Sequence, residues 1–184
     1  MAADFTPASY TNYGVEATVS APGGDTEYYN PVGKEDPEAC RSIYSGSILS
    51  TWIQNGTATY GFMDGTSMAC PHVSGVAALG LSYAVKQRRH FKATEFIELL
   101  KNSAKPLDGW YTGGKVKTYY RNHLSAGASP TKVELSKYVG KMGTGLVNAG
   151  SLLNSIEGSG SDMVVPNVYV AEVQHRLLIW LTTL

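Results

Sequence analysis

The sequence predicts an α/β fold, because strand-like and helical segments follow one another along the chain. Residues 14–21 alternate in polarity and end at a Pro-Gly-Gly turn, as a strand does. Two β-rich runs within residues 47–62 flank Asn55-Gly56, a strong hairpin signal. Residues 67–87 are helical in pattern and apolar on every side, which is typical of a buried helix. We expect a parallel strand of a central sheet, a hairpin, and a helix from Ser67 that is the most buried element.

Two shorter helices are expected after these elements. Residues 91–104 carry an apolar stripe of Phe96, Leu99 and Leu100, and Pro106 ends the segment. A glycine turn at 142–145 precedes a short helix for which Asn148 fits the N-cap position. A dinucleotide-binding interpretation of that turn fails, because the third glycine is missing and no βαβ unit surrounds it.

Composition restricts the class of protein. The chain has 184 residues, enough for one domain with a core, and its 15 basic and 15 acidic residues give a net charge of zero. This balance favours neither nucleic acid nor an acidic membrane. Cys40 and Cys70 form no disulfide framework and no metal-binding spacing. The N-terminus lacks the pattern of a signal peptide, and the apolar run 177–181 is too short to span a bilayer.

The segment 105–141 is basic and rich in tyrosine. It holds seven Lys and Arg residues against Asp108 and Glu134. Basic residues among aromatics can bind nucleic acid, but no recognition motif accompanies them, so we expect a solvated surface insertion at 110–141. Ser129-Pro130 is expected to open a short helix through Tyr138. The predicted domain is 1–157, and 158–184 is a linker followed by a further β segment or a swapped tail.

Ser67 is the candidate nucleophile. It follows Gly65-Thr66 at a strand-to-helix junction, where small neighbours let a substrate approach. The N-terminus of a helix offers unpaired N–H groups and a positive dipole end, both of which favour developing negative charge. A simple serine N-cap would show the same local pattern. The nucleophile elbow of α/β-hydrolases needs a second glycine, which is absent here.

The stretch 65–79, GTSMACPHVSGVAAL, closely resembles the nucleophile motif of the subtilases, the subtilisin-like serine peptidases. Further pieces resemble the family in the same order, and together they cover roughly residues 3–156: ASYTNYGVEATVSAPGGD, ILSTW, YGFMDG, ATEFIELLKNSA and GTGLVNAGSLL. The resemblance implies the C-terminal half of a doubly wound parallel sheet. It also implies that Ser67 is the acylating nucleophile, with Thr66 beside the oxyanion site. Gly65 then allows close approach of the substrate, and Met68 packs against the catalytic site.

The base and the acid of such a peptidase are missing from the sequence. His72 lies about 140° round the helix from Ser67, so we expect a buried structural histidine. The three remaining histidines, His90, His123 and His175, lack the glycine of the family's H-G-T motif. The family's D-[ST]-G and A-G-N segments are absent too. In subtilisins the aspartate and then the histidine precede the serine along the chain. We therefore expect the C-terminal half of a catalytic domain, inactive alone.

Two other functions are also consistent with the sequence. The chain could be a stand-alone, non-catalytic module that binds peptides or assembles along an exposed sheet edge. An α/β-hydrolase esterase would need a late histidine, such as His123 or His175. A reading frame upstream that carries the three missing motifs would decide for the half-enzyme.

Cofactors and partners follow from the same reasoning. No metal site is predicted: Glu16 is present in the segment that resembles a cation site of the family, but Thr18 stands where an acid is common. A stabilising Ca²⁺ in a full-length enzyme is therefore not supported by this chain. The expected partners are a peptide or protein substrate, the missing N-terminal half and a second copy, contacted through the exposed sheet edge and the tail after Gly158. Neither nucleic acid nor membrane is expected. The sequence itself gives no localisation, and the family resemblance implies a secreted or extracytoplasmic full-length protein.

Overall fold

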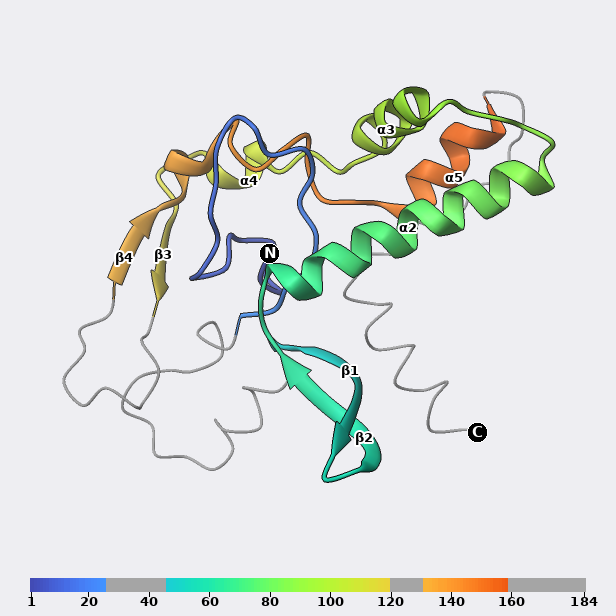
Figure 1. The fold of residues 1–184 in the computed structure, drawn as a ribbon. Coiled ribbons are helices and arrows are strands. Elements are labelled where there is room, and N and C mark those ends of the chain that lie inside the picture. Colours follow the sequence, from blue (N-terminus) through green and yellow to red (C-terminus); the bar gives the residue numbers. More distant parts are fainter. Residues whose placement is uncertain (26–45, 120–130, 159–184) are drawn as a thin grey trace.

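The computed structural model describes residues 1–25, 46–119 and 131–158 of the chain (Figure 1). In these ranges, loops and short strands surround the N-terminus, and a layer of helices lies beside them (Figure 1). The elements in chain order are β1 (Ile48–Gln54), β2 (Thr57–Met63), α2 (Thr66–Lys86), α3 (Ala93–Asn102), α4 (Asp108–Tyr111), β3 (Val116–Tyr119), β4 (Thr131–Glu134), the 3₁₀ helix η2 (Leu135–Tyr138) and α5 (Ala149–Glu157).

The predicted hairpin is confirmed. β1 and β2 pair antiparallel from Ile48 opposite Met63 to Gln54 opposite Thr57. The turn residues Asn55 and Gly56 both have positive φ, 51° and 77°. This is the backbone that a two-residue type I′ turn requires, and it explains why Asn-Gly is the strongest local hairpin signal. The hairpin projects away from the helices (Figure 1).

The predicted parallel strand at residues 14–21 is wrong. The segment is extended only near its end, where Ser20 forms a one-residue parallel bridge with Leu146. Ser20 N donates to Gly145 O, and Val147 N donates to Ser20 O, each at 2.8 Å. The ladder stops there because Gly143 and Gly145 in the partner segment have φ of 73° and 146°, outside the β region. The described residues are mixed helix and strand, in two antiparallel pairs, without the doubly wound parallel sheet.

Helix α2 forms where it was predicted, but the expectation that it is the most buried element is wrong. Only Gly80 and Ala84 are buried along its 21 residues. Leu79, Leu81 and Val85 are 48%, 46% and 68% exposed. A helix that is apolar all round needs cover on every side, and the described elements cover one side. On that side α5 approaches so closely that a Cβ on Gly80 would be 2.7 Å from Leu152 Cδ2.

Among the described residues, α2 is also the one helix that is long and apolar enough to cross a membrane, judged by length and composition alone. Core helices of globular proteins have the same length and composition. The covered side of α2 packs against Phe96 and Leu100 of α3 and Leu152 and Ile156 of α5. These contacts are those of a helix packed within a protein.

The predicted helices around 91–104 and after Asn148 are confirmed. α3 buries Phe96 and Leu100, and its first turn is closed by Lys92 N, which donates to Glu95 Oε2 at 2.8 Å. Asn148 caps α5, because its Oδ1 accepts from Ser151 N at 3.0 Å. Arg89, just after α2, donates to the Ile156 carbonyl near the end of α5. A helical core joins these elements, formed by Ala21, Ala84, Phe96, Leu100, Val147, Leu152 and Ile156.

The surface insertion expected at residues 110–141 stays a prediction, because most of its described residues are exposed but several side chains are buried. Tyr111 is fully buried, and Lys117 is only 7% exposed. A second cluster, which we call the network core, contains Met1, Leu107, Tyr111, Leu135, Tyr138, Met142 and Leu146. The expected helix ending at Tyr138 is a strand followed by the single 3₁₀ turn η2. Ser129, Pro130 and the tail after Gly158 lie outside the described residues, as do Cys40, His123 and His175.

Candidate active site

Ser67 lies in the first turn of α2, four residues after the end of β2. The turn depends on Gly65, the N-cap residue, whose φ of 150° and ψ of 165° favour glycine. No side chain caps the helix at this end. Thr66 and Ser67 are exposed, whereas Met68 is half-buried. The Ser67 hydroxyl is therefore open to a ligand at a positive helix terminus.

The turn at residues 21–25 lies directly against the residues before Ser67. Gly65 N donates to Gly23 O at 2.8 Å. A Cβ on Gly23 would be 2.7 Å from Gly65 O, and one on Gly24 would be 2.3 Å from Asp64 Oδ1. Gly23 therefore needs glycine for close backbone approach, whereas Gly24 favours glycine because of its φ of 76° and the nearby Asp64 side chain. The sequence predicted a turn here but not its contact with the nucleophile loop.

Tyr10 holds this turn in place. Its hydroxyl lies 2.8 Å from Gly23 O and 2.6 Å from Gly24 O, and it donates toward both carbonyls. Burial and the nearby negative charge of Asp64 raise the pKa of Tyr10, so the hydroxyl keeps its proton at neutral pH. Ser9, the preceding residue, donates from N and Oγ to the carboxylate of Asp25, at 2.8 and 3.0 Å. Sequence reasoning missed Tyr10, because nothing local in the sequence pairs it with the glycines.

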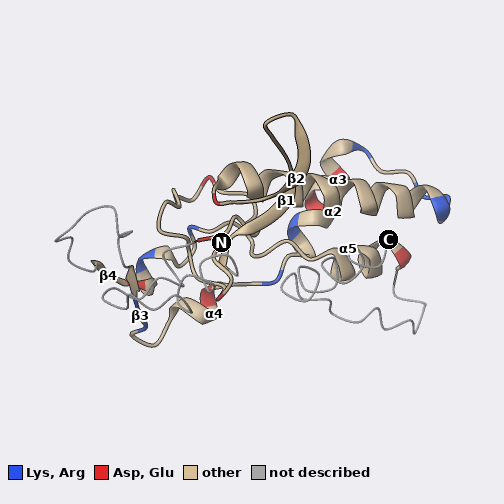
Figure 2. Cartoon of the chain, turned by 90° about the horizontal axis from the view of Figure 1, so that it is seen from below, with Lys and Arg blue, Asp and Glu red and all other residues tan. Residues whose placement is uncertain are grey.

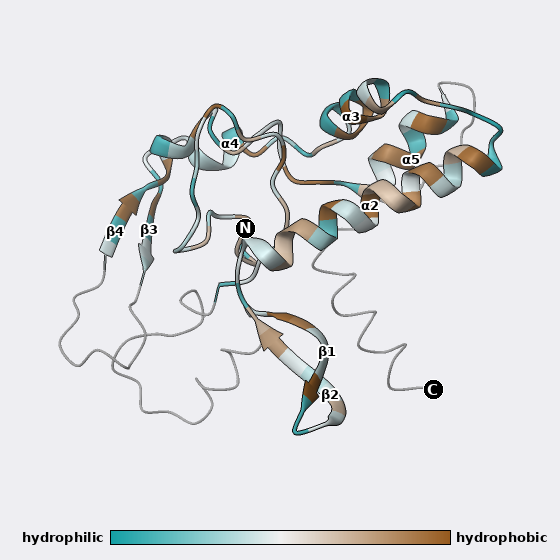
Figure 3. Ribbon diagram, viewed as in Figure 1, coloured by the Kyte–Doolittle hydropathy of each residue, from teal (hydrophilic) through white to brown (hydrophobic). Residues whose placement is uncertain are grey.

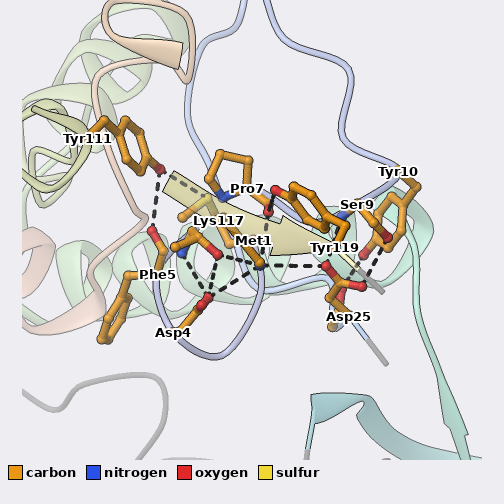
Figure 4. A network of polar contacts seen from close by, with 12 residues as sticks. Met1, Asp4, Phe5, Pro7, Ser9, Tyr10, Asp25, Tyr111, Lys117 and Tyr119 are labelled. Atoms are coloured by element: carbon orange, nitrogen blue, oxygen red, sulfur yellow. Dashed lines mark hydrogen bonds and ion pairs between the residues drawn. The ribbon is translucent and has the colours of Figure 1, made fainter. Parts of the chain in front are cut away.

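Asp25, the last residue of the turn at 21–25, also belongs to a buried ionic cluster around Lys117. Lys117 Nζ lies 3.7 Å from both Asp4 Oδ1 and Asp25 Oδ2, and donates to Pro7 O at 3.3 Å (Figure 4). Burial lowers the pKa of Lys117, while the two carboxylates oppose that shift. Asp25 is 1% exposed.

Elsewhere in the described chain, residues of both charge signs are interspersed (Figure 2).

The histidine nearest in sequence to Ser67 is not its base. His72 Nδ1 lies 2.8 Å from Met68 O, one turn back on its own helix. This confirms that His72 is engaged away from Ser67, although it is half-buried rather than buried. His90 lies beyond the end of α2. Within the described ranges, no histidine or carboxylate hydrogen-bonds the Ser67 hydroxyl, and no three His, Cys, Asp or Glu side chains gather as a metal site.

An exposed serine at a strand–turn–helix junction, framed by glycines that admit close backbone approach, is the local arrangement that a nucleophilic serine needs. A model of the subtilase family matches residues 2–145, so the chain belongs to the subtilase family.

Three curated relatives agree with this assignment. An "Extracellular protease" of Xanthomonas campestris pv. campestris is 37% identical over 111 residues, covering 58% of this chain and 15% of that protein. An "Extracellular basic protease" of Dichelobacter nodosus is 30% identical over 55% of this chain and 14% of its own length. A "Thermophilic serine proteinase" of Bacillus sp. strain AK1 is 30% identical over 61% of this chain and 21% of its own length. The chain thus matches well under a quarter of the length of each relative.

Proposed function

We propose that this chain contributes the nucleophile of a serine endopeptidase and that Ser67 is that nucleophile. The observation that carries the proposal is the exposed Ser67 hydroxyl at the start of α2, within the matched range 2–145. Family membership supports serine peptidase chemistry in general. The assignment of Ser67, and of its neighbours below, is the finer step that an experiment must test.

In the proposed reaction, Ser67 Oγ attacks the carbonyl carbon of a peptide bond and passes its proton to a histidine base. Backbone N–H groups at the start of α2 lie beside Thr66 and help to hold the tetrahedral oxyanion. The C–N bond then breaks, the amine leaves with the proton, and water hydrolyses the acyl-enzyme on Ser67. Gly65 leaves room for the substrate backbone, and Met68 supports the nucleophile turn from the half-buried side.

The base, its orienting aspartate and an oxyanion asparagine come, in this proposal, from polypeptide outside the 184 residues. Support comes from the side of α2 left uncovered and from the absence of a base at Ser67 within the described ranges. A serine without a positioned base keeps its proton near neutral pH. The chain alone is therefore expected to be inactive, and its substrate is a protein or peptide.

The test is covalent labelling of Ser67 by a fluorophosphonate probe. We expect no labelling of the 184-residue chain alone, and labelling after it is mixed with an N-terminal portion from a full-length subtilase. Ser67→Ala should abolish that labelling, whereas Ser74→Ala, an exposed serine two turns further along α2, should not. Strong labelling of Ser67 in the isolated chain would contradict the half-enzyme proposal, because it would require a base within this chain.

A second candidate is a non-catalytic module that binds peptides or assembles with other chains. The observation that favours it is the same lack of a base at Ser67 among the described residues. It predicts peptide binding that is equal in the wild type and Ser67→Ala, with no labelling under any mixture. Export of the whole protein is also proposed, because two of the relatives are named extracellular. We propose no role for a cofactor, nucleic acid or membrane.

A further inference from the structure

The turn that carries Ser67 joins the β1–β2 hairpin to α2, and both of these elements carry apolar segments (Figure 3). No side chain caps α2 at this end. Gly65 links the turn to the helix instead, because its carbonyl accepts from Met68 N at 3.0 Å and from Ala69 N at 3.3 Å. The position of Gly65 therefore sets the position of Ser67, which lies two residues further along the chain.

The carbonyl of Gly23 is shared by this turn and by Tyr10. It accepts from Gly65 N at 2.8 Å and from the Tyr10 hydroxyl at 2.8 Å. A carbonyl oxygen has two lone pairs, so it can accept both bonds. The Tyr10 hydroxyl also lies 2.6 Å from Gly24 O, which holds it between two successive carbonyls. A path of hydrogen bonds therefore runs from the Tyr10 hydroxyl through Gly23 to Gly65.

The segment that carries Tyr10 is itself fixed to the glycine turn. Ser9, the preceding residue, donates from N and Oγ to the two carboxylate oxygens of Asp25. Asp25 is buried, and Lys117 Nζ lies 3.7 Å from its Oδ2. Figure 4 shows Ser9, Tyr10, Asp25 and Lys117 in one network of side chains. This anchor limits the movement of the Tyr10 backbone, so the hydroxyl is presented to the glycine turn in one place.

We propose that Tyr10 is a positioning residue for Ser67: its hydroxyl holds the Gly23 carbonyl, and that carbonyl holds Gly65 at the start of α2. The inference rests on the proposed function, because a role in positioning a nucleophile requires that Ser67 is one. Tyr10 acts through the backbone of its neighbours. A misplacement of the reacting atom by about 1 Å can cost on the order of a hundredfold in rate, so a group that holds the turn also affects the chemistry.

A pair of tyrosines provides a matched test. Tyr10→Phe removes the hydroxyl and keeps the ring. Tyr13→Phe is the control, because Tyr13 is similarly exposed, at 41% against 37% for Tyr10, and its ring packs edge-on against Tyr138. In the full chain alone, the Gly65 amide should exchange about fivefold faster or more in Tyr10→Phe and at the wild-type rate in Tyr13→Phe. Because this measurement needs no catalysis, it tests the path through Gly23 separately from the proposed function.

The second measurement is the rate of fluorophosphonate labelling after the chain is mixed with an N-terminal portion of a subtilase. In Tyr10→Phe we expect the rate constant at saturating probe to fall by about tenfold, while the half-saturating probe concentration stays the same. Tyr13→Phe should label as the wild type does. A merely structural role of Tyr10 would instead reduce the fraction of chain that is labelled and leave the rate constant unchanged.

The outcomes separate the two proposals. Equal labelling rate constants in the wild type and Tyr10→Phe would overturn the positioning role and leave the proposed function standing. No labelling of the wild-type mixture would overturn the proposed function, and the positioning role with it. Equal exchange of the Gly65 amide in the two chains would overturn the path through Gly23. If Tyr10→Phe does not fold, Ser9→Ala, which removes the Oγ bond to Asp25, should slow labelling in the same way, and an unchanged rate constant would overturn the inference.

Discussion

The network core and the helical core are stabilised in different ways. Beside the network core lie polar contacts between residues far apart in sequence, such as Tyr119 with Pro7 and Lys117 with Asp4 and Asp25 (Figure 4). The helical core is continuous where α5 and α3 meet α2, but the described residues leave the opposite side of α2 uncovered. Among the described residues, one region is therefore closed by long-range contacts, whereas the other has an uncovered side. The turn that carries Ser67 is held by Tyr10 and by the glycine turn at residues 21–25.

The largest expected effect is the loss of Lys117. Lys117→Met should lower the free energy of unfolding by about 3–5 kcal/mol, because two carboxylates remain without their buried cation. Urea denaturation measures the change. Lys115→Met, at an exposed position in the same strand region, should change stability by only about 0.5 kcal/mol or less. Equal effects of the two substitutions would show that the buried cluster does not stabilise the network core.

The matching test of the helical core is Leu152→Ala. Leu152 of α5 is fully buried against Gly80 of α2. Its truncation should therefore lower the free energy of unfolding by about 2–5 kcal/mol, through lost burial and a cavity. Leu81→Ala, at a site that is 46% exposed on the open side of α2, should cost less than about 1 kcal/mol. A large loss at Leu81 would mean that something covers the open side of α2 in solution.

The contact between the glycine turn and the nucleophile loop is tested by Gly24→Ala. The φ of 76° and the closeness of Asp64 Oδ1 oppose any Cβ, so we expect a loss of about 1–3 kcal/mol in unfolding free energy. Gly14→Ala, where a Cβ would meet nothing within 4 Å, is the control and should be nearly neutral. Thermal unfolding distinguishes the two, and equal behaviour would remove the argument for a tight turn.

The smallest effect is on the pH dependence of stability. Burial lowers the pKa of Lys117 below its ordinary 10.5, so between the folded pKa and 10.5 the unfolded chain binds more protons than the folded one. Lys117 therefore makes the free energy of unfolding rise with pH between its folded pKa and 10.5. Tyr10, Tyr111 and Tyr119 have raised pKa values and oppose the rise only near and above 10.0. Below that pH, wild type should show a more positive slope of unfolding free energy than Lys117→Met, and identical slopes would contradict the shift.

The features that the sequence predicted are those that depend on local chemistry. Asn55-Gly56 specifies its turn through positive φ, and Asn148 caps α5 through a contact three residues away. The strand-to-helix junction at Ser67 is likewise predicted by local sequence, namely Gly65 and the apolar helix that follows it. These signals require only neighbouring residues, so they can be recognised without knowledge of the rest of the fold.

The features that the sequence did not predict depend on distant partners. Residues 14–21 have a strand-like pattern, but whether they join a ladder is decided by the glycines of residues 143–145. The apolar pattern of α2 predicts burial, but the residues that cover the helix come from segments far away in the sequence. In the sequence Lys117 resembles a surface lysine, and its burial follows from Asp4 and Asp25, about 90 or more residues away. Tyr10 acquires its role in the same way from Gly23 and Gly24.

The central claim is that Ser67 is a nucleophile that becomes reactive only with a base from outside this chain. The most direct measurement is mass spectrometry of the Ser67 peptide after exposure to a slowly deacylating ester, with and without an N-terminal portion of a subtilase. We predict an acyl adduct on Ser67 in the mixture and none in the chain alone. An adduct on another residue in the mixture, or on Ser67 in the chain alone, would contradict the account.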